Sequence, residues 1–229
     1  MKIFNNDILI FIGDNRCDYR SLLSSKMPVT VDRFTIHQHK MIKMEQTASD
    51  IIRYVDKSQA GSGFMAELPE IPLADGMITD CPNIFLMVRT ADCYPVIFYD
   101  SVNKVVAVAH SGREGTKLNI SGKMIDQFIN KFKSSPENIH AIIGPGISEA
   151  HYEVDEDTFK DFVAATDLPQ NYRKLDLLKV ITKQILDKNI PSVNLQFIPE
   201  CTYENQNYFS FRRDKTKNRQ IALIGIINE

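Results

Sequence analysis

The sequence predicts an α+β fold, a single-domain α/β sandwich with mixed sheets. Three observations support this class: β-branched and aromatic runs alternate with polar turns, hairpin-like strand pairs recur, and helical segments are inserted between those pairs. The chain has 229 residues, of which 43% are hydrophobic, and a net charge of −2, which suits a folded globular protein. No lasting change of composition marks a boundary, so we expect one domain over residues 1–229.

The middle of the chain predicts three neighbouring strands followed by a helix. The strands are "IFLMV" (84–88), "PVIFY" (95–99) and "KVVAVAH" (104–110), and "DSVNK" at 100–104 suits a hairpin turn. Residues 120–132 carry apolar side chains at helical spacing, so this helix should cover one face of the sheet.

The remaining elements are predicted by the same patterns. The first 60 residues mix short strand-like runs with polar turns, and "SQAGSGF" suits a loop. In the second half we expect strands in "HAIIGPGI", "VNLQFIP", "NYFSFRR" and "RQIALIGII", and helices over 154–165 and 175–187.

Charge and hydropathy exclude some classes of function. Lys and Arg number 27 against 29 Asp and Glu, without a dense basic face, so we expect no nucleic-acid partner. The apolar runs are too short to span a bilayer and the N-terminus lacks a signal-peptide pattern. Four widely spaced cysteines without a CxxC pair indicate free thiols, and we expect a cytoplasmic protein.

The thiol of Cys93 lies in "TADCYPVIFYD", directly before a predicted strand. Cys93, His110 and one of the pair His37 and His39 lie at strand ends, and a thiolate with two imidazoles is a sound three-ligand zinc set. A buried cysteine acting as a small hydrophobe, with a hydrogen-bonded histidine, would explain the same residues. The pattern alone leaves both interpretations open.

Two further segments carry polar groups. "AHSGREGT" leaves a strand through two glycines and could present backbone N–H groups to an anion, or simply make a tight strand-to-helix connection. "FSFRRD" places Arg212 and Arg213 together, and strand alternation would send them to opposite faces.

Several motifs in one order resemble a known family. "ADGMIT", "TADCYPV", "AHSGREGT", "GPGISEAHYEV" and "CTYENQNYFSFRRDKTKNRQIA" are similar to motifs of the laccase-like (multicopper polyphenol oxidase) family, regarded as zinc-dependent purine nucleoside phosphorylases. The resemblance covers about two thirds of the chain. It implies the laccase-domain sandwich, which is similar to the fold of cytotoxic necrotizing factor.

The resemblance also implies a metal site. In that family one cysteine and two histidines hold Zn²⁺, with copper the older assignment; Cys93 and His110 match two of these ligands. The third ligand belongs to a Gln-x-His-Gly motif. The match there selects His37 or His39.

The implied activity is phosphorolysis of purine nucleosides (adenosine, inosine, guanosine, methylthioadenosine), with adenosine deamination as a side activity. Asp92, Arg212, Arg213 and the turn from Arg113 to Gly115 are the candidates for positioning nucleoside, phosphate and proton.

Two departures concern the phosphate. The family's HAGWRG is "HSGREG" here, and its Ser-Thr-Arg stretch is shortened to "FIGDNRCDYR", so Arg16, Arg20 or Arg113 could substitute.

Three other functions are compatible with parts of the sequence. Copper-dependent oxidation of phenols would need more histidines than the five present. A cysteine hydrolase would use Cys93 as nucleophile and His110 as base. A non-catalytic binding protein would need neither metal nor turnover.

Overall fold

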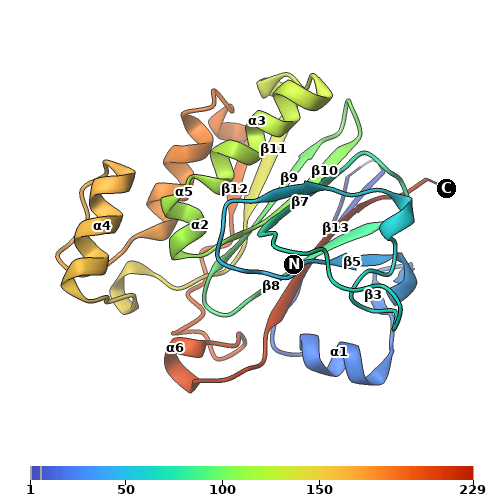
Figure 1. The fold of residues 1–229 in the computed structure, drawn as a ribbon, viewed down its shortest axis with the longest axis horizontal. Coiled ribbons are helices and arrows are strands. Elements are labelled where there is room, and N and C mark those ends of the chain that lie inside the picture. Colours follow the sequence, from blue (N-terminus) through green and yellow to red (C-terminus); the bar gives the residue numbers. More distant parts are fainter. Residues whose placement is uncertain (1, 6, 229) are drawn as a thin grey trace.

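Two mixed β-sheets packed face to face form the centre of the structure, a computed structural model that describes residues 2–5 and 7–228 (Figure 1). The larger sheet has the strand order β12 (Leu195–Phe197), β11 (Ile139–Ile143), β9 (Tyr94–Asp100), β10 (Val105–Ser111), β7 (Gly76–Thr79) and β6 (Ile52–Tyr54). The smaller sheet has the order β1 (Lys2–Asn5), β2 (Ile8–Ile12), β13 (Gln220–Ile226), β8 (Phe85–Thr90) and β5 (Met41–Lys43). A separate hairpin joins β3 (Val29–Val31) to β4 (Phe34–Ile36).

Most strand pairs are antiparallel. The exceptions are β5 with β8, β6 with β7 and β11 with β12, which are parallel. The five-stranded and the six-stranded sheet each contain parallel and antiparallel pairs, so both are mixed, as the sequence predicts.

Successive side chains of β9 alternate between two hydrophobic cores. Ile97 and Tyr99 belong to the core between the sheets, whereas Val96 and Phe98 belong to the core beneath the helices. Successive side chains of a strand point to opposite faces, so a strand buried on both sides is apolar throughout.

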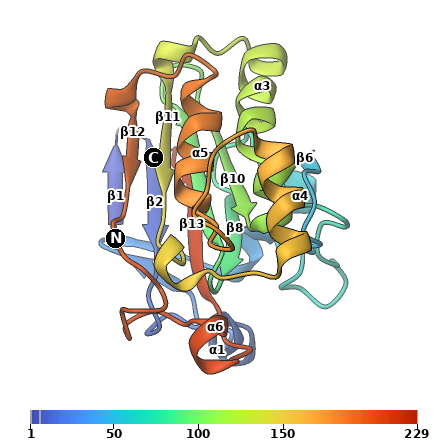
Figure 2. The ribbon, with the colours of Figure 1, turned by 90° about the vertical axis from the view of Figure 1, so that its left-hand side faces the viewer.

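Helices cover the outer face of the six-stranded sheet (Figure 2). They are α3 (Ile120–Phe132), α4 (Glu156–Thr166) and α5 (Leu177–Leu186), preceded by the short α2 (Arg113–Lys117). The helix α1 (Tyr19–Ser25) and the β3–β4 hairpin pack on the other sheet, and α6 (Phe211–Asp214) lies at the same end of the molecule as α1 (Figures 1 and 2). Single 3₁₀ turns occur at Gln38–Lys40, Lys57–Gln59, Pro136–Asn138, Glu149–His151 and Ser192–Asn194.

The structure corrects two expectations. The run 84–88 is a strand, but β8 lies in the five-stranded sheet and is not a neighbour of β9. Residues 207–213 are not a strand: they form a loop and the first turn of α6, because the Ser210 side chain caps the Arg213 N–H. Elsewhere the predicted strands and helices are confirmed to within a few residues.

Within residues 2–5 and 7–228, the helices are all too short or too polar to cross a bilayer.

The core beneath the helices supplies a test of stability. Phe128 of α3 is fully buried and its ring lies 6.5 Å from that of Phe98. We expect Phe128→Ala to lower the free energy of unfolding by about 3–5 kcal/mol, because it removes apolar contacts and leaves a cavity. The matched variant Phe197→Ala, at a side chain that is 56% exposed, should cost about 0.5 kcal/mol or less. Urea denaturation followed by circular dichroism measures both, and equal losses would contradict this account of the core.

Candidate active site

Cys93 lies where the chain crosses from one sheet to the other. Strand β8 ends at Thr90 and β9 begins at Tyr94, so residues 91–93 form the crossing. The β9–β10 hairpin pairs Tyr94 with Ser111, and a Cβ atom placed on Gly112 would lie 2.9 Å from the Cys93 Sγ atom. A glycine is therefore needed beside the thiol.

His110 stands beside Cys93 and is held by a buried carboxylate. Its Nδ1 atom lies 2.7 Å from Oδ1 of Asp75, a residue with no exposed surface. Asp75 Oδ2 accepts hydrogen bonds from the backbone N–H groups of Thr47 (3.0 Å) and Ser49 (2.7 Å) and from the Ser49 hydroxyl (2.8 Å). The carboxylate fixes the imidazole and leaves its Nε2 atom for a second partner.

The surroundings of His110 favour its charged form. Burial disfavours the charged imidazole, but the neighbouring Cys93 side chain and the hydrogen bond to Asp75 outweigh burial and raise the pKa of His110 to about 9. Burial would raise the pKa of Asp75, yet hydrogen bonds from His110 and Ser49 hold that pKa below its ordinary value. A thiol, an imidazole and a carboxylate thus form one polar group at the crossing.

Two cavities open on either side of Cys93, and both are also lined by Ala91. The cationic cavity, of about 470 Å³, is lined by Tyr19, Arg20, Gln46, Arg89, Thr90, Ala91, Cys93, His110, Lys217 and Arg219. The aromatic cavity, of about 350 Å³, is lined by Ala91, Asp92, Cys93, Ile147, Tyr152, Leu177, Phe211, Arg212 and Lys215.

The cationic cavity carries an excess of positive charge. Four of its lining side chains are Lys or Arg. Among the described residues, no carboxylate lines it. Arg89 is bonded to Glu70 at 3.0 Å, and Arg219 donates to the carbonyl groups of Thr216 and Asn218. Arg20 and Lys217 are exposed at the cavity, so their charges are available to an anion.

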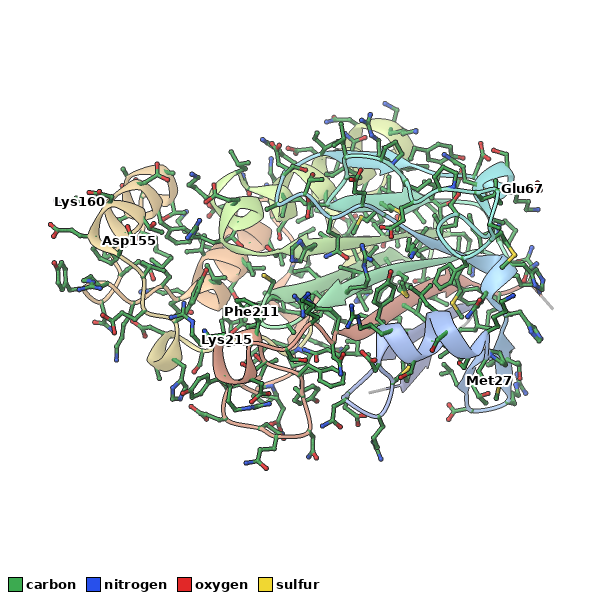
Figure 3. The ribbon with its side chains drawn as sticks, turned by 60° about the horizontal axis from the view of Figure 1, so that its bottom comes forward. Met27, Glu67, Asp155, Lys160, Phe211 and Lys215 are labelled. Atoms are coloured by element: carbon green, nitrogen blue, oxygen red, sulfur yellow. The ribbon has the colours of Figure 1, made fainter. Side chains whose placement is uncertain are left out.

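The aromatic cavity offers ring faces with cations beside them. Burial raises the pKa of Tyr152 to about 12, so its phenol stays neutral. The Arg212 guanidinium lies 5.3 Å from the centre of the Tyr152 ring and donates to the Glu153 carbonyl at 2.9 Å. Phe211 begins α6, and Lys215 directly follows the helix (Figure 3).

Asp92 connects the thiol segment to α6. Its Oδ1 accepts the Thr202 hydroxyl at 2.7 Å and its Oδ2 accepts the Arg212 backbone N–H at 2.7 Å. Since both oxygens are engaged, the structure gives Asp92 the part of a positioning residue.

Three predicted substrate-binding residues do not line either cavity. The Arg213 guanidinium donates to the carbonyl groups of residues 202, 203 and 208 and to Asp214. Arg113 pairs with Glu114 at 3.0 Å. A Cβ on Gly115 would lie 3.0 Å from the His110 carbonyl oxygen, so this glycine permits close backbone packing.

The predicted metal ligands are not all brought together. His37 and His39 are exposed, with stacked rings 5.6 Å apart, and neither lines the cavities at Cys93. Among the described residues, no three His, Cys, Asp or Glu side chains gather in a way that could hold a metal ion. The side chains around Cys93 therefore do not fit a three-ligand zinc site.

Reasoning from the sequence missed several residues of the site. Asp75 lies within the motif "ADGMIT", so a signal existed, but its role depends on a contact 35 positions along the chain. Tyr152 lies within "GPGISEAHYEV" and Arg219 within "CTYENQNYFSFRRDKTKNRQIA", so the resemblance also contained a signal for both, whereas Gln46 lies outside the matched motifs.

Known proteins resemble this chain over most of its length. It is 31% identical over 205 residues to the purine nucleoside phosphorylase YlmD of Bacillus subtilis, covering 85% of this chain and 74% of that protein. It is 35% identical over 188 residues to a purine nucleoside phosphorylase of Clostridium acetobutylicum, covering 79% and 75%.

Two solved structures are also similar to this chain in fold. The hypothetical protein YfiH of Bacillus licheniformis superimposes with a TM-score of 0.75 at 34% identity, covering 82% of this chain and 75% of that one. YlmD from Geobacillus stearothermophilus gives 0.78 at 28% identity, covering 84% and 75%. The family model described as multi-copper polyphenol oxidoreductase laccase matches residues 12–227, and the chain therefore belongs to this laccase-domain family.

Proposed function

We propose that this protein is an enzyme that cleaves purine nucleosides with phosphate, giving the free base and ribose 1-phosphate. The observation that carries the proposal is the pair of cavities of opposite character that meet at Cys93. Relatives named purine nucleoside phosphorylase support the same conclusion.

The cationic cavity suits phosphate. Arg20, Lys217 and Arg219 line it, and an imidazolium at His110 would add a further positive charge at its inner end. Guanidinium and ammonium groups are strong donors to phosphate oxygens, and their charge attracts the anion.

The aromatic cavity suits a purine. Tyr152 and Phe211 offer ring faces for stacking, and Arg212 and Lys215 lie beside them. The ribose would then lie at Cys93, between base and phosphate.

The reaction follows from this placement. A phosphate oxygen forms a bond to C1′ while the bond from C1′ to the purine nitrogen breaks, and the purine leaves with the bonding electrons. Lys215 lies on the purine side, where its positive charge stabilises the departing base.

Deamination and copper oxidation would both use a metal centre, and the described histidines do not gather into one. His140 stacks on Tyr99, and His151 is bonded to Glu204. The cysteines at 17, 81, 93 and 201 are free thiols, and we infer that the enzyme works in the reducing cytoplasm.

The direct test is turnover of inosine or adenosine. We expect purified protein to release the free base only when phosphate is present, as measured by liquid chromatography. His110→Ala should lower kcat about 100-fold, because it removes a charge and a proton carrier beside the reacting atoms. The matched control His151→Ala changes a surface histidine and should leave kcat unchanged. Base release that ignores phosphate, or no release at all, would refute the proposal.

Cation substitutions separate phosphate binding from nucleoside binding. We expect Lys217→Gln to raise the KM for phosphate roughly tenfold through loss of one charged hydrogen bond, with little change in the KM for inosine. Arg16→Gln is the control, since Arg16 is exposed, pairs with Asp14 and does not line the cationic cavity. Steady-state kinetics with each substrate varied in turn gives both constants, and an effect confined to inosine would contradict the assignment.

The aromatic cavity makes the converse prediction. Tyr152→Leu should raise the KM for inosine about tenfold, because stacking on a base is worth on the order of 1–3 kcal/mol, and should spare the KM for phosphate. Tyr172→Leu, at a side chain that is 68% exposed and outside both cavities, serves as the control. An unchanged KM for inosine in Tyr152→Leu would place the purine elsewhere.

A further inference from the structure

We propose that this chain has lost the third ligand of its family's metal site at Ala48, and that Cys93, His110 and Asp75 form a metal-free thiol centre open to carbon electrophiles. The proposal concerns the composition of the site and goes beyond the reaction proposed above.

Gln46 occupies the glutamine position of the family's Gln-x-His-Gly motif. Gln46 lines the cationic cavity together with Cys93 and His110, whereas His37 and His39 do not. The Gln46 side chain accepts from the Arg89 N–H at 3.0 Å and donates to the Arg89 carbonyl at 2.8 Å. Glutamine is thus fixed at the site, and residues 46–49 read Gln-Thr-Ala-Ser.

Position 48 lies beside His110. The N–H groups on both sides of it, from Thr47 and Ser49, donate to Oδ2 of Asp75, whose Oδ1 bonds to His110. The Ser49 carbonyl also lies 3.2 Å from where a Cβ on Gly115 would be, so this turn packs on α2, which directly follows β10. A ligand at position 48 would stand next to the imidazole, and a methyl group has no lone pair to offer.

The backbone conformation at Ala48 suits a histidine. Ala48 has a φ of 59°, in the left-handed region. Histidine is among the residues enriched there, whereas alanine is not. The turn therefore has the conformation to carry a histidine, and Ala48→His should not strain it.

Without a third ligand, Cys93 and His110 remain as a pair. Two ligands, Cys93 and His110, are one fewer than catalytic zinc sites use, so affinity for zinc is lost. The same Asp75 that would orient a metal-binding histidine orients His110 toward Cys93, with Gly112 leaving room for the sulfur. Cys93 is partly exposed between two cavities, where an electrophile can reach it. In alkylation the Cys93 sulfur forms a bond to the carbon, the leaving group departs with its electrons, and the thiol proton is released to water.

Zinc content tests the proposal independently of turnover. The full-length chain is incubated with one equivalent of Zn²⁺, desalted and measured by plasma mass spectrometry. We expect below about 0.1 zinc per chain in the wild type and about one in Ala48→His, since the variant restores a three-ligand site. Ala164→His, on the exposed face of α4, is the matched control and should stay at the wild-type level.

Thiol alkylation supplies the second measurement. Iodoacetamide should modify Cys93 of the wild type at the same rate with and without excess zinc, as followed by peptide mass spectrometry. Zinc should slow the reaction at least about tenfold in Ala48→His, because a metal-bound thiolate is shielded. A wild-type chain that retains one zinc, lost in Cys93→Ala, would overturn the proposal, and so would an Ala48→His chain that is folded by circular dichroism and binds none.

These readouts do not depend on the proposed reaction. A chain without phosphorylase activity could still show the zinc and alkylation results expected here, and an active chain could still contradict them.

Discussion

The buried carboxylate of Asp75 is the interaction on which the site depends. It has no exposed surface, and its two oxygens take up His110 on one side and the turn at Thr47 and Ser49 on the other. The backbone of the same residue accepts the His110 N–H at 2.7 Å. A charge so deeply buried is tolerated only because every strong acceptor position is used. One side chain thereby joins the end of β10, the start of β7 and the turn after β5.

Local patterns in the sequence were sufficient for most elements and for the pair of Cys93 and His110. The alternation and the turn at 100–104 predict the β9–β10 hairpin, and its register brings the segment before β9 alongside the segment after β10. The Cys93 thiol and the His110 imidazole therefore meet because they flank one hairpin and lie close together in the sequence. The helices were equally local, since their periodicity needs no information about distant partners.

Long-range features could not be predicted in the same way. The run 84–88 has the composition of a buried strand in either sheet, and only the crossing at residues 91–93 decides that it pairs with β13. "NYFSFRR" has high strand propensity, yet Ser210 and Asp92 bind its backbone N–H groups and close a helical turn. Tertiary contacts overrode propensity there, as they placed His37 on the surface and Gln46 in the cavity.

The β9–β10 hairpin has a consequence for how this protein can diverge from its relatives. Cys93 and His110 are positioned together, because any change that shifts the hairpin's register would also turn apolar side chains out of two cores. The turn at Ala48 is under no such constraint: it is exposed, and its bonds to Asp75 are made by backbone groups and by neighbouring side chains. The side chain at position 48 can therefore change without removing any of these bonds, while the architecture around Asp75 stays the same.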